Sequence, residues 1–525
     1  MLAATFTQGG DFKIDSMSTT ANRKYLIGVD LGTQGAKAGL FRDDGKAVAT
    51  RFHASKLYQP SVGVVEEDPE YQVKTVCQCI KGCLKATSVD PRQVVAIGID
   101  GQMAGVVGVG ADGHHLTPYD SWLDTRCAPY IDQMQKRAGR RITQKAGAPP
   151  SFNHGPKKLW WKHERPKVYR NIAAFVQPAG YAAMRLCGLA AEQAFVDDTY
   201  LHFSGFADNA RRRWDKSLCK SFDFDAAKLP KIVSPTDIVG ELTSSMARRC
   251  GLGVGTRCVA GCGDATALLL ACGATQPGIC VNIAGTASVF AATTEEFTPD
   301  TEHQVLAWTR AATPGLWHPL AYINGGGMNL EWFARELATL GRGKEKNTLT
   351  QLNRLAEKIK PQIDDPMFIP HLGGRVMPAQ PNLRGSWAGL AWSHTAGHLY
   401  RAMLEAVALE YGVYRQVLTA LSPQARLKEL RITGGGAKSR LWNQIKADAL
   451  NMHVLQINRS EGAPLGVAML AAQAAGIYAS VESVADDWIS AKNAIRPNKR
   501  NHKHYEQRLA RYQQLLDLLD QWANH

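Results

Sequence analysis

Short apolar runs that end in polar or glycine-rich turns recur along this chain of 525 residues. Residues 25–29 and 38–42 are two such runs, both rich in strand-forming side chains. Asp43-Asp44-Gly45 is a hairpin turn signal that leads into a third run at 46–50. The pattern therefore predicts a strand, a tight loop, a strand, a turn and a strand at this point of the chain.

Similar runs recur further along and alternate with helical spacing. Apolar runs predict strands at 94–100, 258–264, 279–291 and 428–436, while helical spacing predicts helices at 399–420, at 439–450 and after residue 496. Strands that alternate with helices are typical of the α/β class, so we expect an α/β protein.

The pattern of a strand, a Gly-Thr turn and a second strand near residue 30 is repeated at 279–291, around Gly285-Thr286. This repeat predicts two related domains whose loops converge on one ligand, with a boundary at 273–278, where the sequence GATQPG breaks the pattern. A cleft that closes between two domains excludes water, as a kinase requires. The expected parts are a disordered extension (1–23), a first domain (24–276), a second domain (277–496) and a terminal helix (497–525).

The formal net charge of +14 raises the question of a nucleic-acid partner. The basic residues are spread out, however, and the densest clusters, 211–213 and 492–503, are not interleaved with aromatic residues on a recognisable binding module. We therefore expect a solvated basic face and no nucleic-acid partner.

Other bulk features concern location. No apolar run is long enough to span a bilayer, and residues 1–24 lack the apolar stretch of a signal peptide. The eleven cysteines are scattered through apolar segments, which is typical of reduced proteins. We expect a cytoplasmic protein without a membrane partner, and we expect a homodimer.

The loop between the first two predicted strands carries Gly32, Thr33, Gln34 and Lys37. Glycines let backbone N–H groups approach an anion, threonine adds a hydroxyl donor, and lysine adds charge. Asp30, at the end of the first strand, suits a metal ion or its water. These residues fit the phosphates and Mg²⁺ of a nucleotide, and they equally fit an ordinary hairpin with a solvated acid.

Several motifs in a fixed order make the chain similar to a known family. They are DLGTQGAKAGLF (30–41), DGQMAG (100–105), SWLDTR (121–126), GCGD (261–264), AGTAS (284–288), GSWAGLAWSHTAGHLYRAMLE (385–405) and GGGAKSRLWNQIKADAL (434–450). Together they resemble the FGGY carbohydrate kinases, the sugar-kinase branch of the actin/Hsp70-like ATPases, and most closely the xylulokinase branch. The resemblance implies two actin-like (ribonuclease H-like) domains with a central catalytic cleft, and ATP and Mg²⁺ as cofactors.

The resemblance also implies roles for individual residues. Asp264 is the expected catalytic base, although from its sequence context it equally fits a cap of the helix that follows. Asp124 either faces the sugar or pairs with Arg126. The expected cofactor-binding residues are Gly32, Thr33, Gln34, Lys37, Gly285 and Thr286 for the phosphates, Gly434, Gly435, Gly436, Ala437 and Asn443 for the adenosine, and Asp30 for the metal. The expected sugar-binding residues are Gln102, Met103, Ala104, Asp124 and Asp264.

The sequence also departs from the family pattern. Xylulokinases usually carry His at the position of Ala104 and Asn at the position of Ala265, and the signature around 152–164 keeps only Lys157 and Trp160. We expect an ATP-dependent kinase of a pentulose whose sugar pocket differs from that of an ordinary xylulokinase. The alternatives are a kinase of another ketose or polyol, or a catalytically silent sugar- or nucleotide-binding sensor.

Overall fold

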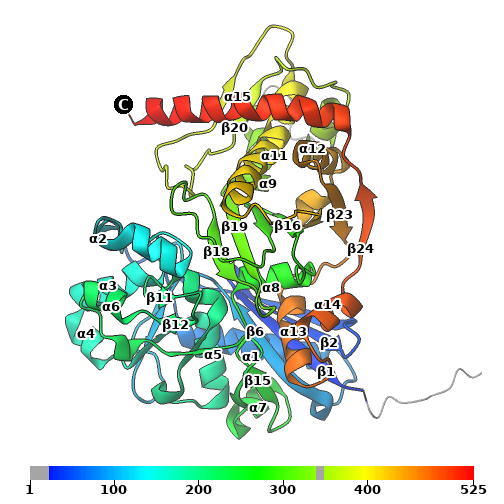
Figure 1. Cartoon of the computed structure of the whole chain (residues 1–525). Helices are drawn as coiled ribbons and strands as arrows, with labels where there is room; N and C mark the ends of the chain where they lie inside the picture. The colour runs from blue at the N-terminus through cyan, green and yellow to red at the C-terminus, as the bar shows by residue number, and fades with distance from the viewer. Residues whose placement is uncertain (1–22, 339–347, 525) are drawn as a thin grey trace, which may run out of the picture.

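The computed structural model describes residues 23–338 and 348–524. The extension expected over 1–23 therefore lies, except for Arg23, outside the described residues. Two lobes, each built on a β-sheet, lie one above the other in Figure 1. Strands and helices alternate in both, which confirms the α/β class.

The first sheet has six strands in the order β14-β15-β6-β1-β2-β3. β1 lies antiparallel to β2 and parallel to β6, so the predicted hairpin forms the centre of the sheet. The strands are β1 (Tyr25–Gly32), β2 (Gly35–Arg42), β3 (Ala47–Ala54), β6 (Val94–Gly101), β14 (Ile238–Glu241) and β15 (Arg257–Val259).

The second sheet has seven strands in the order β18-β19-β17-β16-β22-β23-β24. Its centre repeats the first sheet, because β16 lies antiparallel to β17 and parallel to β22. The strands are β16 (Ile279–Ala284), β17 (Ser288–Ala292), β18 (Ala307–Arg310), β19 (Trp317–Ile323), β22 (Glu429–Thr433), β23 (His453–Ile457) and β24 (Ala491–Ile495).

The match extends beyond the hairpins. Outward from the hairpin, β3 and β19 are each antiparallel to the hairpin's second strand. In the other direction, β15 pairs in parallel with β6, and β23 pairs in parallel with β22. Each sheet then ends in an antiparallel edge strand, β14 beside β15 and β24 beside β23. The two sheets therefore share the topology of six strands, and the second sheet adds β18 beyond β19.

Alternating side chains of the first sheet bury two different faces. Ile27 and Val29 point into the core under α1 (Pro69–Lys85), α5 (Pro178–Cys187) and α7 (Ser244–Cys250). Leu26 points to the opposite core, which is covered by α8 (Asp264–Ala271) and α13 (Ala463–Ala474). This period of two is what a strand covered on both faces requires.

Helix α13 follows the second sheet in sequence but packs on the first. It contacts β1, β6 and α8, and Figure 1 shows it in the lower lobe beside β1 and β2. A Cβ on Gly28 would stand 1.8 Å from the Pro464 carbonyl oxygen, so only glycine lets the helix approach β1 this closely. The chain thus passes into the second domain and returns.

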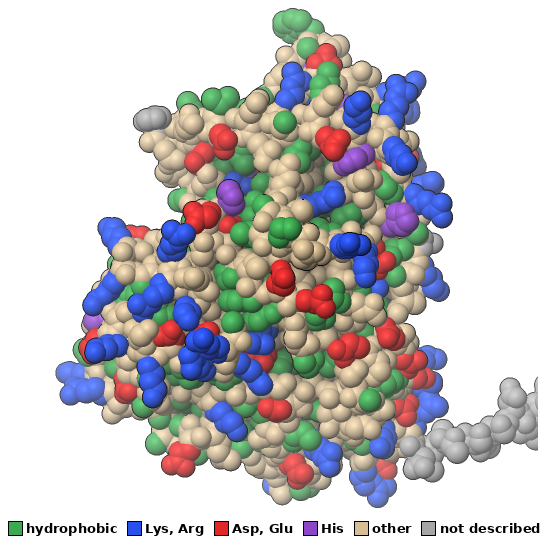
Figure 2. Space-filling view, viewed as in Figure 1, with side chains coloured by type: hydrophobic (Ala, Val, Ile, Leu, Met, Phe, Trp, Pro, Cys, Tyr) green, Lys and Arg blue, Asp and Glu red, His purple; other side chains and the backbone are tan. Residues whose placement is uncertain are grey.

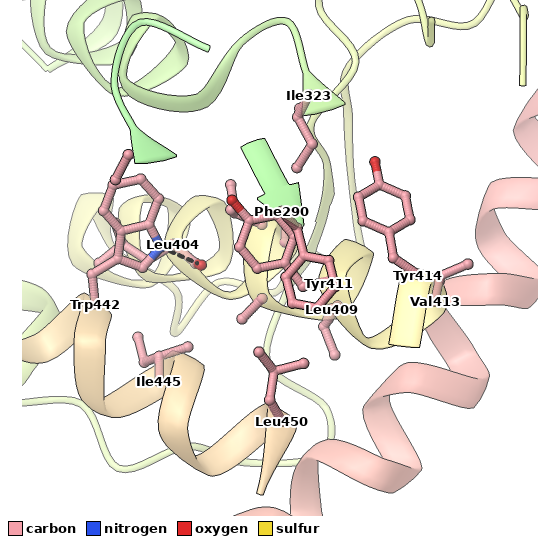
Figure 3. Close-up of a cluster of buried hydrophobic side chains, with 14 of the residues drawn as sticks. Phe290, Ile323, Leu404, Leu409, Tyr411, Val413, Tyr414, Trp442, Ile445 and Leu450 are labelled. Carbon is pink, nitrogen blue, oxygen red and sulfur yellow. Dashed lines mark hydrogen bonds between the residues drawn. The ribbon is translucent and has the colours of Figure 1, made fainter. Parts of the chain in front are cut away.

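Helices of the second domain enclose a large apolar core. Figure 3 shows Phe290, Tyr411, Trp442 and Leu450 packed between the sheet and two of these helices. Ser439 caps the helix that carries Trp442 by accepting a hydrogen bond from its backbone N–H at 3.3 Å. The helices are α9 (Gly326–Trp332), α10 (Thr348–Glu357), α11 (Ala396–Leu421), α12 (Arg440–Leu450) and α15 (Lys499–Ala523), with α14 (Val481–Trp488) beside α13.

A mixed segment between β6 and β14 completes the first lobe. Besides α5, its α-helices are α2 (Ala128–Ala146), α3 (His154–Glu164), α4 (Pro166–Asn171) and α6 (Lys216–Ser221), and its longest 3-10 helix is η3 (Asp198–Phe203). Its short strands are β7 (Val107–Val109), β8 (Tyr119–Asp120), β9 (Ala174–Val176), β10 (Phe195–Asp197), β11 (Ala207–Asp208), β12 (Arg213–Trp214) and β13 (Lys231–Val233). Within the described part of the chain, none of the helices has the length and apolar character needed to cross a membrane.

Candidate active site

Two carboxylates meet where the central strands of the first sheet end. Asp30 on β1 and Asp100 on β6 are register partners in the parallel pair, so their side chains leave the sheet at the same level. Asp100 is fully buried. When both acids are ionised, the two carboxyl oxygens of Asp100 and Oδ1 of Asp30 lack a hydrogen-bond donor among the described residues, whereas a proton on one of the acids lets the pair share a hydrogen bond. Unpartnered buried oxygens of this kind call for an explanation such as a bound ion.

Asp264 is the first residue of α8 and lies close to this pair. Its turn is joined to the end of β6 by a parallel bridge between Gly101 and Gly263. Burial and the charge of Asp30 raise the pKa of Asp264 to about 7, although its carboxylate accepts a hydrogen bond from the Ala265 amide at 2.7 Å. The residue as a whole is only partly buried. A carboxylate with a pKa near neutrality suits proton transfer.

The three carboxylates shift one another's ionisation. Burial, and then the charges of Asp30 and Asp264, hold the pKa of Asp100 well above its ordinary value. Burial likewise raises the pKa of Asp30, while a hydrogen bond with the Asp100 carboxyl group and then the charge of Lys37 oppose that shift. The cluster therefore resists carrying three negative charges at once.

The donor set fits Mg²⁺, which prefers carboxylate oxygens and binds through one or two of them together with waters and substrate phosphates. In the described residues no three His, Cys, Asp or Glu side chains converge as a complete metal site. Asp30 and Asp100 with their unpartnered oxygens are thus a partial site, to which a nucleotide would add ligands.

The first Gly-Thr loop faces a polar network. The Thr33 hydroxyl accepts a hydrogen bond from Trp122 Nε1 at 2.8 Å and lies 3.4 Å from Gln102 Oε1. Gln102 in turn donates to Glu67 Oε1 at 2.9 Å. Trp122 is 42% exposed, so it forms an accessible edge of this network. The structure therefore brings Thr33 to the predicted sugar residue Gln102.

Gln34 lies in that loop, and Lys37 lies on β2 just after it. Gln34 is exposed, and its backbone carbonyl accepts a hydrogen bond from the Ser55 backbone amide. Lys37 donates from Nζ to the Glu461 carbonyl at 2.9 Å, which ties the first hairpin to the segment before α13. Their predicted contacts with phosphate stay predictions.

Met103 and Ala104 follow Gln102 on the same loop. Met103 packs against Gly263, directly before Asp264, and its carbonyl contacts His154 Nε2 at 2.8 Å. The Ala104 carbonyl lies 3.4 Å from the Tyr119 hydroxyl, while the methyl group offers no hydrogen bond. The structure therefore places the Gln102–Ala104 loop beside the turn that carries Asp264.

Asp124 forms the ion pair that was one of its two predicted roles. It is fully buried, and its carboxylate accepts hydrogen bonds from Arg126 Nε and Nη2 at 2.6–2.9 Å and from the Val65 amide at 2.8 Å. Lys157 holds the segment from the other side by donating to the Ser121 and Asp124 carbonyls, both at 2.9 Å. This arrangement leaves the sugar contact of Asp124 as a prediction.

The second Gly-Thr loop opens into a separate pocket of about 650 Å³. Four of the predicted nucleotide residues line it: Gly285, Thr286, Gly435 and Gly436. Gly434 has a φ of +88° and a Cβ there would stand 2.6 Å from the Ala284 carbonyl oxygen, so the turn requires glycine. The structure thus brings together the loop predicted to bind phosphate and the loop predicted to bind adenosine.

Ala437 and Asn443 lie beneath that pocket rather than on its wall. Both are buried, and Asn443 donates from Nδ2 to the Ala437 carbonyl at 2.7 Å. Trp442, which does line the pocket, is held by its Nε1 hydrogen bond to the Leu404 carbonyl, drawn in Figure 3. Asn443 therefore closes the loop from below, and its predicted contact with the base stays a prediction.

The basic cluster at 211–213 is paired with acids. Arg211 and Arg213 each form an ion pair with Asp208, and Arg212 pairs with Asp198 at 2.7 Å. Figure 2 shows Lys and Arg side chains scattered with acidic ones over this side of the lower lobe.

The duplicated sheets, the carboxylates of the first domain and the glycine-lined pocket of the second define a class of protein, the two-domain actin-like phosphotransferases. Comparison with known proteins gives the family. The FGGY family of carbohydrate kinases matches over its N-terminal domain at residues 25–271 and over its C-terminal domain at residues 280–475, so the chain belongs to the FGGY carbohydrate kinases.

Individual relatives align over nearly the whole chain. Xylulose kinase of Bacillus subtilis is 27% identical (92% of this chain and 95% of that protein), and xylulose kinase of Escherichia coli K12 is 28% identical (93% and 96%). Gluconokinase of B. subtilis is 25% identical (88% and 90%). The crystal structure of xylulose kinase from Rhodospirillum rubrum superimposes with a TM-score of 0.86 at 25% identity (96% and 100%). The fold and the carbohydrate kinase class are thereby confirmed.

Sequence reasoning assigned no role to three side chains of this site. Asp100 stood in a recognised motif, and its place at the end of a buried strand, like that of Asp30, was the available signal. Trp122 likewise stood in the SWLDTR motif. Glu67 carries no local signal, because only the fold brings it 2.9 Å from Gln102.

Proposed function

We propose that this enzyme transfers the γ-phosphoryl group of ATP to a hydroxyl of a small sugar, with Asp264 as the base. The observation that carries the proposal is the position of Asp264, with a pKa raised to about 7, beside the Asp30–Asp100 pair and the Gln102–Ala104 loop. A sugar hydroxyl is a weak nucleophile, and a carboxylate within hydrogen-bond reach removes its proton as it attacks.

The sugar oxygen forms a bond to the γ-phosphorus, the bond from that phosphorus to the bridging oxygen breaks, and ADP leaves while the hydroxyl proton passes to Asp264. Mg²⁺, held by Asp30 with Asp100 beside it, would supply positive charge to the phosphates. Gly285 and Thr286 would position the phosphates, and the pocket at Gly435 and Gly436 would hold the adenosine.

For the substrate, we propose a pentulose other than D-xylulose. Xylulose kinases and gluconokinases are both among the relatives, which supports a small open-chain sugar or its acid. The methyl group of Ala104 cannot exchange hydrogen bonds with a hydroxyl, so this site discriminates only weakly on that side.

The test is a coupled ADP-release assay over a panel of ketoses, polyols and sugar acids. We expect one ketose to exceed D-xylulose in kcat/KM. D-xylulose as the best substrate would contradict our interpretation of the pocket. A sugar that binds by calorimetry without any compound stimulating ADP release would instead make the protein a sensor.

A second experiment alters the pocket directly. Ala104→His combined with Ala265→Asn supplies polar side chains at the two departing positions, so the ratio of kcat/KM for D-xylulose to that for the best natural sugar should rise about tenfold or more. Ala104→Ser with Ala265→Ser is the control for polarity without the larger side chains. An unchanged ratio in the first variant would separate these positions from sugar recognition.

A further inference from the structure

The short 3-10 helix η3 (Asp198–Phe203) carries two buried hydroxyl groups that the reaction described above does not use. Thr199 and Tyr200 are 0% and 2% exposed. Neither belongs to a motif singled out in the sequence, yet both contact the backbone at the catalytic end of the first sheet.

Tyr200 joins the two turns that meet at Asp264. Its hydroxyl lies 2.9 Å from the Gly101 carbonyl and 3.3 Å from the Cys262 carbonyl. Gly101 is the last residue before the Gln102–Ala104 loop, and Cys262 lies two residues before Asp264. One hydroxyl therefore spans the sugar loop and the turn of the base.

Thr199 holds the same turn from its other side. Its Oγ1 accepts a hydrogen bond from the Gly263 amide at 3.0 Å and donates to Asp197 Oδ1 at 2.5 Å. Without that acceptor, the Gly263 N–H would be a buried donor with its partner removed, a costly state. The backbone directly before Asp264 is thus fixed by a side chain of η3.

η3 is also in contact with the second domain. The Thr309 hydroxyl on β18 donates to the Thr199 carbonyl at 2.8 Å. Next to it, the Trp308 amide donates to the Gly147 carbonyl at 2.8 Å. β18 is the edge strand of the second sheet, so η3 lies between that sheet and the catalytic turn.

We propose that Thr199 and Tyr200 are positioning residues, which hold the turn of Asp264 against the sugar loop and link it to the second domain. The inference rests on the proposed role of Asp264 as the base. A small misplacement of a catalytic group costs a large part of the rate. Loss of either hydroxyl should therefore act on the catalysed step and leave the nucleotide pocket unchanged.

The test compares Thr199→Val and Tyr200→Phe, which keep size and remove one hydroxyl each. We expect kcat to fall about 10- to 100-fold and the sugar KM to rise, while the KM for ATP stays within about twofold. Thr199→Ser, which restores the acceptor for the Gly263 amide, should recover most of the rate.

Tyr181→Phe is the matched control. Tyr181 is a fully buried tyrosine on α5 of the same domain, and its hydroxyl donates to Glu70 Oε1 on α1 at 2.7 Å. We expect this variant to lose thermal stability comparably and to keep kcat.

The proposal is wrong if Thr199→Val and Tyr200→Phe lose only stability and keep kcat, or if neither folds into a protein whose melting temperature ADP still raises. Asp264→Asn, measured in parallel, separates the two claims. Normal turnover of Asp264→Asn would contradict the role of Asp264 as the base. If Asp264→Asn is inactive while Thr199→Val and Tyr200→Phe are fully active, only the positioning role is contradicted.

Discussion

The two Gly-Thr hairpins share a topology and differ in chemistry. In the first, Asp30 lies opposite Lys37 on β2 and beside Asp100 on β6. In the second, the corresponding strand position is Ile283, which lies opposite Val289 on β17 and beside Thr433 on β22. Every ionisable group of the first set has an uncharged counterpart in the second.

The difference shows how a duplicated fold divides one reaction. The sheet topology places each loop at the same end of its sheet, whatever the side chains are. The carboxylate cluster lies in the first domain, where we propose that it serves metal binding and proton transfer. The second loop carries no charged side chain and opens into a pocket whose wall includes the backbone of Gly435 and Gly436 and the Trp442 ring. Charged residues also line this pocket: Glu331, Arg354, Glu357, Lys438 and Arg440. Backbone and aromatic surfaces suit a nucleoside.

The strongest way to break this asymmetry is to remove the base. Asp264→Asn keeps the shape of the side chain and cannot accept the proton, so turnover should fall by about 10² to 10⁴. ATP binding, measured by calorimetry, should hold, because the pocket belongs to the other domain. Near-normal turnover of this variant would contradict the role of Asp264 as the base.

The pH profile tests the same charge cluster without mutation. The base acts only when deprotonated, and the pKa of Asp264 is raised to about 7. Activity should therefore be lost as the pH falls through about 7, with kcat/KM dropping about tenfold per pH unit below it and levelling above it. Steady-state rates from pH 5 to 9 measure this. If activity instead falls only near pH 4, the ordinary pKa of an aspartate, the raised pKa of Asp264 would be contradicted.

The two threonines sharpen the comparison. The Thr286 hydroxyl belongs to the nucleotide pocket, so Thr286→Val should lower the rate about tenfold for every sugar alike. Thr33 contacts Gln102 and Trp122, so Thr33→Val should change the preference among sugars. Relative kcat/KM values for two sugars measure both. A uniform loss in Thr33→Val would assign that hydroxyl to the phosphates, as the sequence predicted.

The smallest effect concerns stability. The folded-state pKa of Asp100 is raised, so its stabilising contribution is complete below the unfolded pKa near 3.8 and is lost as the pH rises through the folded value. Asp100→Asn removes that loss, and in buffer without metal the melting temperature should rise by about 2–4 °C at pH 8. The gain should vanish near pH 4. An equal gain at both pH values would show that ionisation is not its cause.

Sequence patterns gave the hairpins, the order of the motifs and the α/β class, because these depend on local periodicity and glycine turns. They also placed Gly285, Thr286, Gly435 and Gly436, which share one pocket. Patterns left Asp124 with two roles, because only tertiary structure brings the Val65 amide and the Lys157 ammonium to it. The hydrogen bond from the Gly263 amide to the Thr199 hydroxyl could not be predicted from patterns either, since the two residues lie more than sixty positions apart in sequence.

The return of α13 to the first sheet also sets an order of events during synthesis. β1 and β6 are complete by Gly101, but α13, which together with α8 covers one of their faces, begins only at Ala463. At ordinary rates of translation, that face waits on the order of tens of seconds for its cover. The nascent first domain must therefore leave the ribosome with an open apolar face, and residues 24–276 expressed alone should aggregate unless the later segment is supplied. A protein that begins its core with its first strand thus finishes it only when almost the whole message has been read.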